Sequence, residues 1–195
     1  MIFFLKFDQF KKHLFSAFLS SKNVDIVNLS DRLNLDKKST ECFLYLKLAK
    51  YIDRNRILTL EANDVNSALK EMVDASKSQI NDSQNFLQAL ISREELMSTG
   101  FGFGIAYPHA KTPDVEEFFI TIGVSKQGID WKSFDGKEAR LIFMIGGPDG
   151  QQDTYLKLLA GLSSFLKNSQ LHDQLCEFCE DLDAFYNFIE TKLNQ

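Results

Sequence analysis

The amino-acid sequence predicts a layered α/β domain preceded by a smaller helical module, and the distribution of glycine and proline carries that prediction. All ten glycines and all three prolines of the 195-residue chain lie between Gly100 and Gly161. The preceding 99 residues contain neither and are expected to be mainly helical, whereas the Gly/Pro window is typical of strands and tight turns. Because helical patterns precede and follow the strands, one α/β domain fits better than separate all-α and all-β domains.

Residues 1–52 predict a small all-α module. A stripe of apolar side chains at steps of three or four residues indicates a first amphipathic helix, and we interpret that stripe as core packing rather than membrane attachment. A short helix ending at Leu33, a turn at Asn34 and a second helix over Lys37–Lys50 then form a helix-turn-helix outline. DNA recognition is one interpretation of this module; a partner-docking hairpin or a plain extension are the others. Residues 1–50 carry a net charge of +4 and the remainder −9, an excess too mild to indicate DNA binding by itself.

Residues 53–195 are expected to form the α/β domain. Its first elements are a short strand over Ile57–Leu60, a helix capped by Asn63 or Asp64 and ending near Ala75, and a helix over Phe86–Leu96. Three central strands and three later helices follow, over Phe101–Ala106, Phe118–Ser125, Ala139–Ile145, Tyr155–Leu166, Gln170–Glu180 and Asp183–Leu193.

Several protein classes are excluded by composition and spacing. Three cysteines form no disulfide framework, and we interpret the pair Cys176 and Cys179 as helical residues rather than as a redox or zinc motif. The apolar N-terminal run is broken by Lys6 and Asp8, and no segment approaches the roughly 18 apolar residues of a membrane-spanning helix. We therefore expect a cytoplasmic protein without membrane insertion, bound metal or cofactor.

The candidate chemistry lies in residues 98–110. The alternating glycines of this segment lack the Lys-Ser/Thr of a phosphate loop and do not open a helix, so nucleotide binding is not indicated. Pro108 fixes the backbone before His109, which places an imidazole at the end of a strand. The neutral ring of histidine is nucleophilic near pH 7, since its ordinary pKa is about 6.5, and it can therefore accept a phosphoryl group.

A phosphoryl acceptor also needs hydrogen-bond donors around the incoming oxygens. The guanidinium of Arg93 can bind two such oxygens at once, and Thr99 and the glycine N–H groups can add further donors. Taken singly, His109 equally fits a structural loop histidine and Arg93 a surface cation.

The combination of these residues resembles a known family. The pattern Arg93-Glu-x-x-x-Ser-Thr-Gly-x-Gly-x-Gly-Ile-Ala-x-Pro-His109 closely resembles the active-site segment of the type-2 IIA domains of the bacterial phosphoenolpyruvate-dependent phosphotransferase system (PTS), the fructose, mannitol and nitrogen-regulatory class. Further matches follow at Gly128-Ile-Asp-Trp, Asp135-Gly, the strand leading into Pro148 and Leu156-x-x-Leu-Ala-x-Leu, so the similarity runs from about Ile57 to the C-terminus.

The resemblance implies a three-layer α/β/α sandwich around a small mixed sheet, and a phosphotransferase component that takes its phosphoryl group from the carrier protein HPr. It maps the acceptor onto His109 and the phosphate-binding arginine onto Arg93. Family members usually have a second histidine near the acceptor, and Tyr155 occupies that place here; His172 lies too far along the chain to replace it. A tyrosine hydroxyl can donate to a phosphoryl oxygen but stays neutral near pH 7.

Three roles follow for such a chain. A nitrogen-regulatory IIA protein reports its phosphorylation state to target proteins, and the basic N-terminal module favours this role. A sugar-uptake IIA component instead passes the phosphoryl group to a IIB partner. A transcriptional regulator would bind DNA through residues 1–52 and use the IIA-like part as a sensor. In each role we expect an apolar contact with HPr around Phe101 and Phe103.

Overall fold

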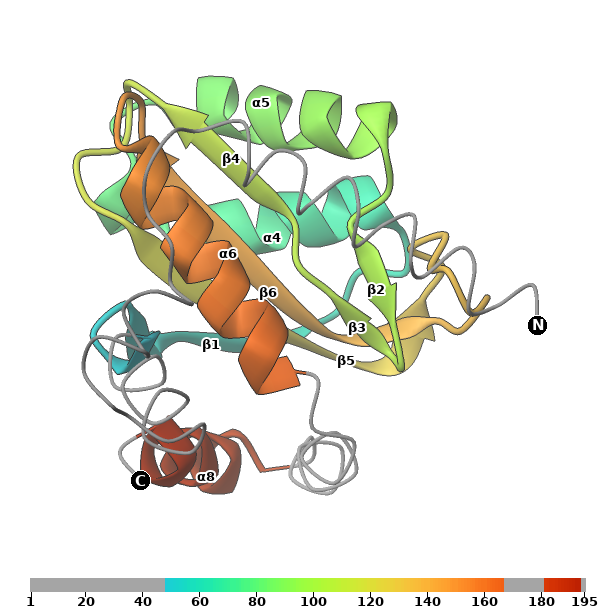
Figure 1. The fold of residues 1–195 in the computed structure, drawn as a ribbon. Coiled ribbons are helices and arrows are strands. Elements are labelled where there is room, and N and C mark those ends of the chain that lie inside the picture. The colour runs from blue at the N-terminus through green and yellow to red at the C-terminus, as the bar shows by residue number, and fades with distance from the viewer. Residues whose placement is uncertain (1–47, 167–180, 194–195) are drawn as a thin grey trace, which may run out of the picture. The chain divides into compact units, whose positions relative to one another are not determined.

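Six strands form one mixed sheet in the computed structural model, which describes residues 48–166 and 181–193 (Figure 1). They are β1 (Ile52–Leu60), β2 (Gly100–Gly102), β3 (Ile105–Ala106), β4 (His109–Thr112), β5 (Phe119–Ile129) and β6 (Ala139–Pro148). The order is β1-β5-β6-β3-β2, and β4 also pairs with β6. Strand β1 is parallel to β5, β5 is antiparallel to β6, and both β3 and β4 are parallel to β6. The predicted small mixed sheet is confirmed.

Four α-helices and a single 3-10 turn complete the described part of the chain. They are α4 (Val65–Ala75), η1 (Lys77–Gln79), α5 (Ser83–Leu96), α6 (Gln152–Leu166) and α8 (Leu182–Leu193). The carboxylate of Asp64 accepts the Ser67 backbone N–H at 3.0 Å and so caps α4, which decides between the two predicted caps. Asp82 caps α5 in the same way.

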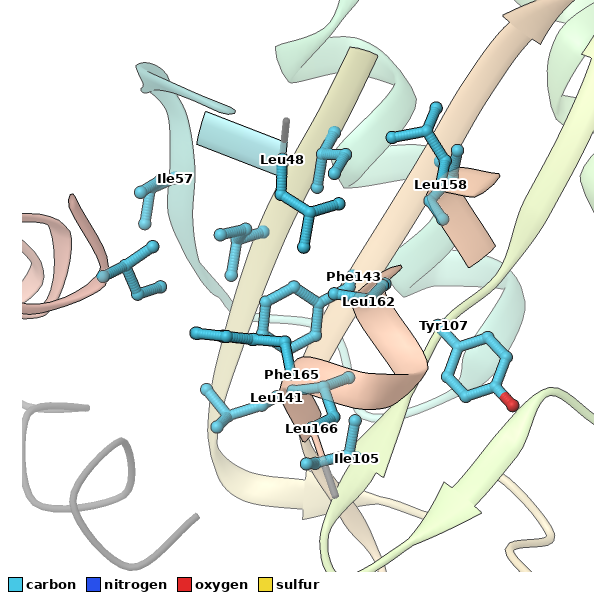
Figure 2. Close-up of a cluster of buried hydrophobic side chains, with 14 of the residues drawn as sticks. Leu48, Ile57, Ile105, Tyr107, Leu141, Phe143, Leu158, Leu162, Phe165 and Leu166 are labelled. Carbon is cyan, nitrogen blue, oxygen red and sulfur yellow. The ribbon is translucent and has the colours of Figure 1, made fainter. Parts of the chain in front are cut away.

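The helices cover both faces of the sheet, because side chains along its strands alternate between two cores. On β5, Ile120 and Ile122 belong to the core beneath α6 and α8, whereas Phe119 belongs to the core beneath α4 and α5. Figure 2 shows part of the first core, in which Phe143 and Leu141 of β6 meet the leucines of α6. The arrangement around the sheet is therefore α/β/α, and no side chain on either face of β5 before Lys126 is exposed.

One predicted strand, Phe101–Ala106, is wrong as a single element. It is a tight hairpin of β2 and β3, in which Gly100 pairs with Ala106 and Gly102 with Ile105. The chain reverses because Gly102, Phe103 and Gly104 have φ angles of 92°, 57° and 78°, a left-handed run that two glycines make accessible. The N–H of Phe103 donates to the Asp135 carboxylate at 2.8 Å, which stabilises the strained non-glycine position.

Other element bounds extend the predicted ones. Strand β1 begins at Ile52, and its polar start reflects an edge strand with exposed residues. Helices α5 and α6 each begin three residues earlier than predicted. The predicted helix-turn-helix, the helix over Gln170–Glu180, all three cysteines and His172 lie outside the described residues. Among the helices that the structure describes, none is long and apolar enough to cross a membrane.

Candidate active site

His109 opens strand β4 at a break in the edge of the sheet. Ile105 lies opposite Leu141 and His109 opposite Ile145, so β3 and β4 follow β6 in one continuous register. The break between them contains Pro108, which has no N–H to donate, although its carbonyl still accepts the Ile145 N–H at 2.9 Å. The backbone is therefore held by β6 on both sides of the break, and His109 is presented rigidly, as predicted.

The hydrogen bonds of the His109 ring define its tautomer. Nδ1 lies 2.9 Å from the backbone carbonyl oxygen of Tyr107, and because a carbonyl only accepts, Nδ1 must carry the proton. In the neutral ring Nε2 then has a free lone pair, and the Nε–H of Arg93 donates to it at 3.1 Å. The reactive nitrogen of this imidazole is therefore Nε2.

Burial keeps the imidazole neutral. His109 is 7% exposed. Desolvation lowers its pKa to about 4; the bond to the Tyr107 carbonyl opposes this shift, and the charge of Arg93 adds to it. Nε2 therefore remains unprotonated well below pH 7, where an ordinary histidine with a pKa near 6.5 would be losing its nucleophile.

We expect an NMR titration of His109 in the folded protein to have its midpoint below about pH 5. Between the lowered pKa and the ordinary value near 6.5, the unfolded chain binds more protons than the folded one, so stability falls as the pH falls through this window. A His109→Gln variant identifies the resonance and should show a smaller loss of stability between pH 7 and 5. A midpoint at pH 6 or above would contradict burial of the ring.

Arg93 reaches His109 from the last turn of α5, which runs alongside β4 (Figure 1). Its Nη1 donates to the carbonyl oxygen of Met97 at 2.9 Å, one of the carbonyls that a helix end leaves without an intrahelical partner. One guanidinium therefore both caps α5 and contacts Nε2. The structure brings together Arg93 and His109, which are 16 residues apart in the sequence.

Two tyrosines flank the imidazole. The ring of Tyr107 is stacked near His109 with centroids 6.3 Å apart, and Tyr155 of α6 meets it edge-on at 5.8 Å. Burial raises the pKa of both phenols, that of Tyr155 to about 12, so both hydroxyls stay protonated at neutral pH. The structure thus places Tyr155 beside the candidate acceptor, where the resemblance implied a second histidine.

Thr99 is buried behind the imidazole and its polar groups are already occupied. Its N–H and hydroxyl donate to the two carboxylate oxygens of Glu94 at 2.7 and 2.5 Å, and its hydroxyl accepts the indole N–H of Trp131 at 3.2 Å. Its carbonyl accepts the N–H of Tyr107 at 3.2 Å, and the carbonyl of Tyr107 in turn bonds His109. Sequence reasoning missed Glu94, although its place directly after Arg93 on α5 is a usable signal.

The predicted docking contact through Phe101 is wrong. Phe101 is 9% exposed and belongs to the core beneath α6, whereas Phe103, in the left-handed turn, is half exposed. The exposed apolar side chains nearest Arg93 in the sequence are Leu96, 83% exposed, and Met97, 50% exposed. Across residues 48–166 and 181–193, no three histidine, cysteine or acidic side chains gather in a way that could hold a metal ion.

Comparison with known proteins identifies the family. Residues 50–192 match the family described as the EIIA 2 component of the phosphoenolpyruvate-dependent sugar phosphotransferase system. The chain belongs to this family. The resemblance found in the Arg93-to-His109 segment is thereby confirmed, and the matched range begins close to the predicted domain boundary.

Relatives of the chain in the EIIA 2 family include proteins named for sugars and for nitrogen regulation. The chain is 37% identical to a fructose-specific EIIABC component of Bacillus subtilis, over 74% of this chain but only 23% of that protein. It is 32% identical to a fructose-like EIIA component of Escherichia coli, over 60% of this chain and 81% of that one. It is 31% identical to a nitrogen regulatory protein of Bradyrhizobium diazoefficiens, over 67% and 85% of the two chains.

Solved structures show the same EIIA 2 fold. The nitrogen regulatory protein IIA-Ntr of Neisseria meningitidis superimposes with a TM-score of 0.61 at 21% identity, over 68% of this chain and 90% of that one. IIA mannitol of Escherichia coli gives 0.55 at 19% identity, over 64% and 89%. These matches confirm the mixed α/β fold of the described domain.

Proposed function

We propose that this chain is a phosphohistidine carrier of the phosphotransferase system and that His109 accepts the phosphoryl group on Nε2. The observation that carries the proposal is the fixed tautomer: the Tyr107 carbonyl holds the proton on Nδ1, so the lone pair of Nε2 is available without prior deprotonation. Burial supports this role because it keeps the ring neutral.

The transfer needs only groups that the described site contains. As Nε2 attacks phosphorus, a new N–P bond forms while the bond from phosphorus to the donor's nitrogen breaks, and the leaving imidazole keeps that electron pair. The ring of His109 gains positive character, which the Tyr107 carbonyl stabilises through the Nδ1 proton. The Nε–H of Arg93 must leave Nε2 before attack, and the freed guanidinium then binds the transferred oxygens.

Thr99 takes a positioning role in this proposal rather than direct contact with phosphate. The only hydrogen of its hydroxyl is bonded to Glu94, and its carbonyl fixes the peptide of Tyr107 that orients His109. The Glu94 carboxylate therefore acts on the acceptor through Thr99 and Tyr107.

The donor that we propose is HPr, and the onward step divides two roles within the family. Relatives named for nitrogen regulation and for fructose both match residues of this chain, so each role has support. We retain the regulatory role as the first proposal, with transfer to a IIB partner as the alternative. A solved complex of IIA mannitol with phosphorylated IIB mannitol from Escherichia coli illustrates the second.

Leu96 and Met97 are proposed to form the contact with HPr. The carbonyl of Met97 accepts from Arg93, so this apolar pair lies beside the group that must meet the phosphoryl donor. A Leu96→Ser variant should bind HPr at least about fivefold more weakly in a titration, since a central apolar contact typically contributes 1 kcal/mol or more. Glu61→Ser, an exposed control next to β1 at the far edge of the sheet, should bind normally. Equal affinity of all three proteins would remove this surface from the proposal.

The function is tested by phosphoryl transfer with phosphoenolpyruvate, Enzyme I and HPr. The purified chain should take up one acid-labile, base-stable phosphoryl group, and mass spectrometry should locate it on His109. Omission of HPr should prevent the labelling, which serves as the control. Absence of labelling with the complete system, or labelling of another residue, would refute the proposal.

A further inference from the structure

The charges around His109 do not balance those of a bound phosphoryl group. Such a group carries a charge of about −1.5 to −2 near pH 7. Arg93 supplies one positive charge, whereas His109 and the phenols of Tyr107 and Tyr155 are neutral in their buried positions. A second cation within reach of Nε2 would complete the site.

Lys111 lies at the right place to supply that charge. It follows His109 by two residues on β4, and side chains two apart along a strand lie on the same face. Its Nζ is 5.0 Å from the centroid of the Tyr155 ring, the same ring that meets His109 edge-on at 5.8 Å. Tyr155 is thus a shared neighbour of the cation and the imidazole.

The resting contacts of Lys111 leave its charge available. Its ammonium donates to the Gln152 side-chain carbonyl at 2.5 Å, a neutral partner at the start of α6. Within the described ranges, no carboxylate forms an ion pair with it, in contrast to Lys77 and Lys132, which both pair with aspartates. The flexible four-carbon stem of lysine lets the ammonium move while the backbone of β4 stays fixed.

We propose that Lys111 is the second phosphoryl-binding cation of this site: when Nε2 carries phosphate, its ammonium leaves Gln152 and pairs with a phosphoryl oxygen across the face of Tyr155. This inference rests on the proposed function. The aromatic face of Tyr155 supports the ammonium in both positions by a cation–π contact. In this chain a lysine and a neutral tyrosine would together do what one cationic side chain could do beside the acceptor.

Phosphoramidate tests the inference without any partner protein. Nε2 of His109 attacks its phosphorus, the N–P bond of the reagent breaks, and the amine leaves as ammonia. The variants are Lys111→Met, Lys111→Arg and the matched control Lys157→Met, an exposed lysine of α6. The measurements are the rate of labelling and the pH midpoint of the phosphorus NMR signal of the phosphorylated protein.

In Lys111→Met we expect labelling about tenfold slower and a phosphoryl midpoint about one pH unit higher, since a nearby opposite charge lowers a pKa by 1 unit or more. Lys111→Arg should restore both values, and Lys157→Met should match the unmodified chain. An unchanged midpoint in Lys111→Met, with or without slower labelling, would overturn the inference because a merely structural role leaves that midpoint in place. Failure of the unmodified chain to label at His109 would instead refute the proposed function.

Discussion

A His109→Ala variant is expected to take up no phosphoryl group from HPr, because no other group at the site can form the N–P bond. Arg93 has no lone pair to offer, and the phenols beside the ring stay protonated at neutral pH. The measurement is incorporation of labelled phosphate from phosphoenolpyruvate through Enzyme I and HPr. The loss should be complete rather than partial.

The variant needs a control for folding, since His109 is buried and alanine leaves a small cavity. His109→Gln keeps more of the volume and a polar end but lacks a nucleophilic ring nitrogen, so it should also be inert. Both variants should bind HPr with nearly the affinity of the unmodified chain. Acid-labile phosphate on a histidine of either variant would show that the acceptor is His13 or His172, and the assignment would be wrong.

The fold was predictable wherever local chemistry repeats along the chain. Apolar runs marked β5 and β6, and Asp64 marked the start of α4. The β2–β3 hairpin was missed because its turn contains Phe103, a residue that rarely adopts a positive φ. Its stabilising bond comes from Asp135, 32 residues away, and no local pattern can reveal such a contact.

The site was predictable in its residue types and less so in its bonding. Arg93 and His109 were marked by their motif, and Tyr155 by its place in the pattern. The bond that sets the tautomer involves the backbone carbonyl of Tyr107, which every residue possesses, so sequence offers no signal for it. The role of Thr99 changed for a similar reason: only the structure shows that Glu94 already occupies its hydroxyl.

Lys111 illustrates the same limit. Its position two residues after His109 was visible in the sequence, and strand alternation predicts a shared face. Its relation to Tyr155 depends on how α6 packs over the sheet, a long-range contact. A neutral partner in Gln152, rather than a carboxylate, is what distinguishes it from an ordinary surface lysine.

An Arg93→Lys variant is expected to accept phosphate at least about 100-fold more slowly, because removal of one preorganised donor to a transferred group typically has an effect of this size. Lysine keeps the charge but not the planar fork that binds two oxygens at once. It also cannot cap α5 at Met97 and meet Nε2 with the same rigid group. Charge alone therefore should not rescue the rate.

The control for Arg93→Lys is Arg54→Lys, an exposed arginine of β1 that pairs with Asp183 and should have no effect on transfer. NMR of the imidazole nitrogens separates binding of phosphate from orientation of the ring. Because the Tyr107 carbonyl holds Nδ1–H independently of Arg93, the tautomer should persist in Arg93→Lys while the rate falls. A changed tautomer would mean that Arg93 acts by orienting His109, and a rate within threefold of the unmodified chain would exclude it from phosphoryl binding altogether.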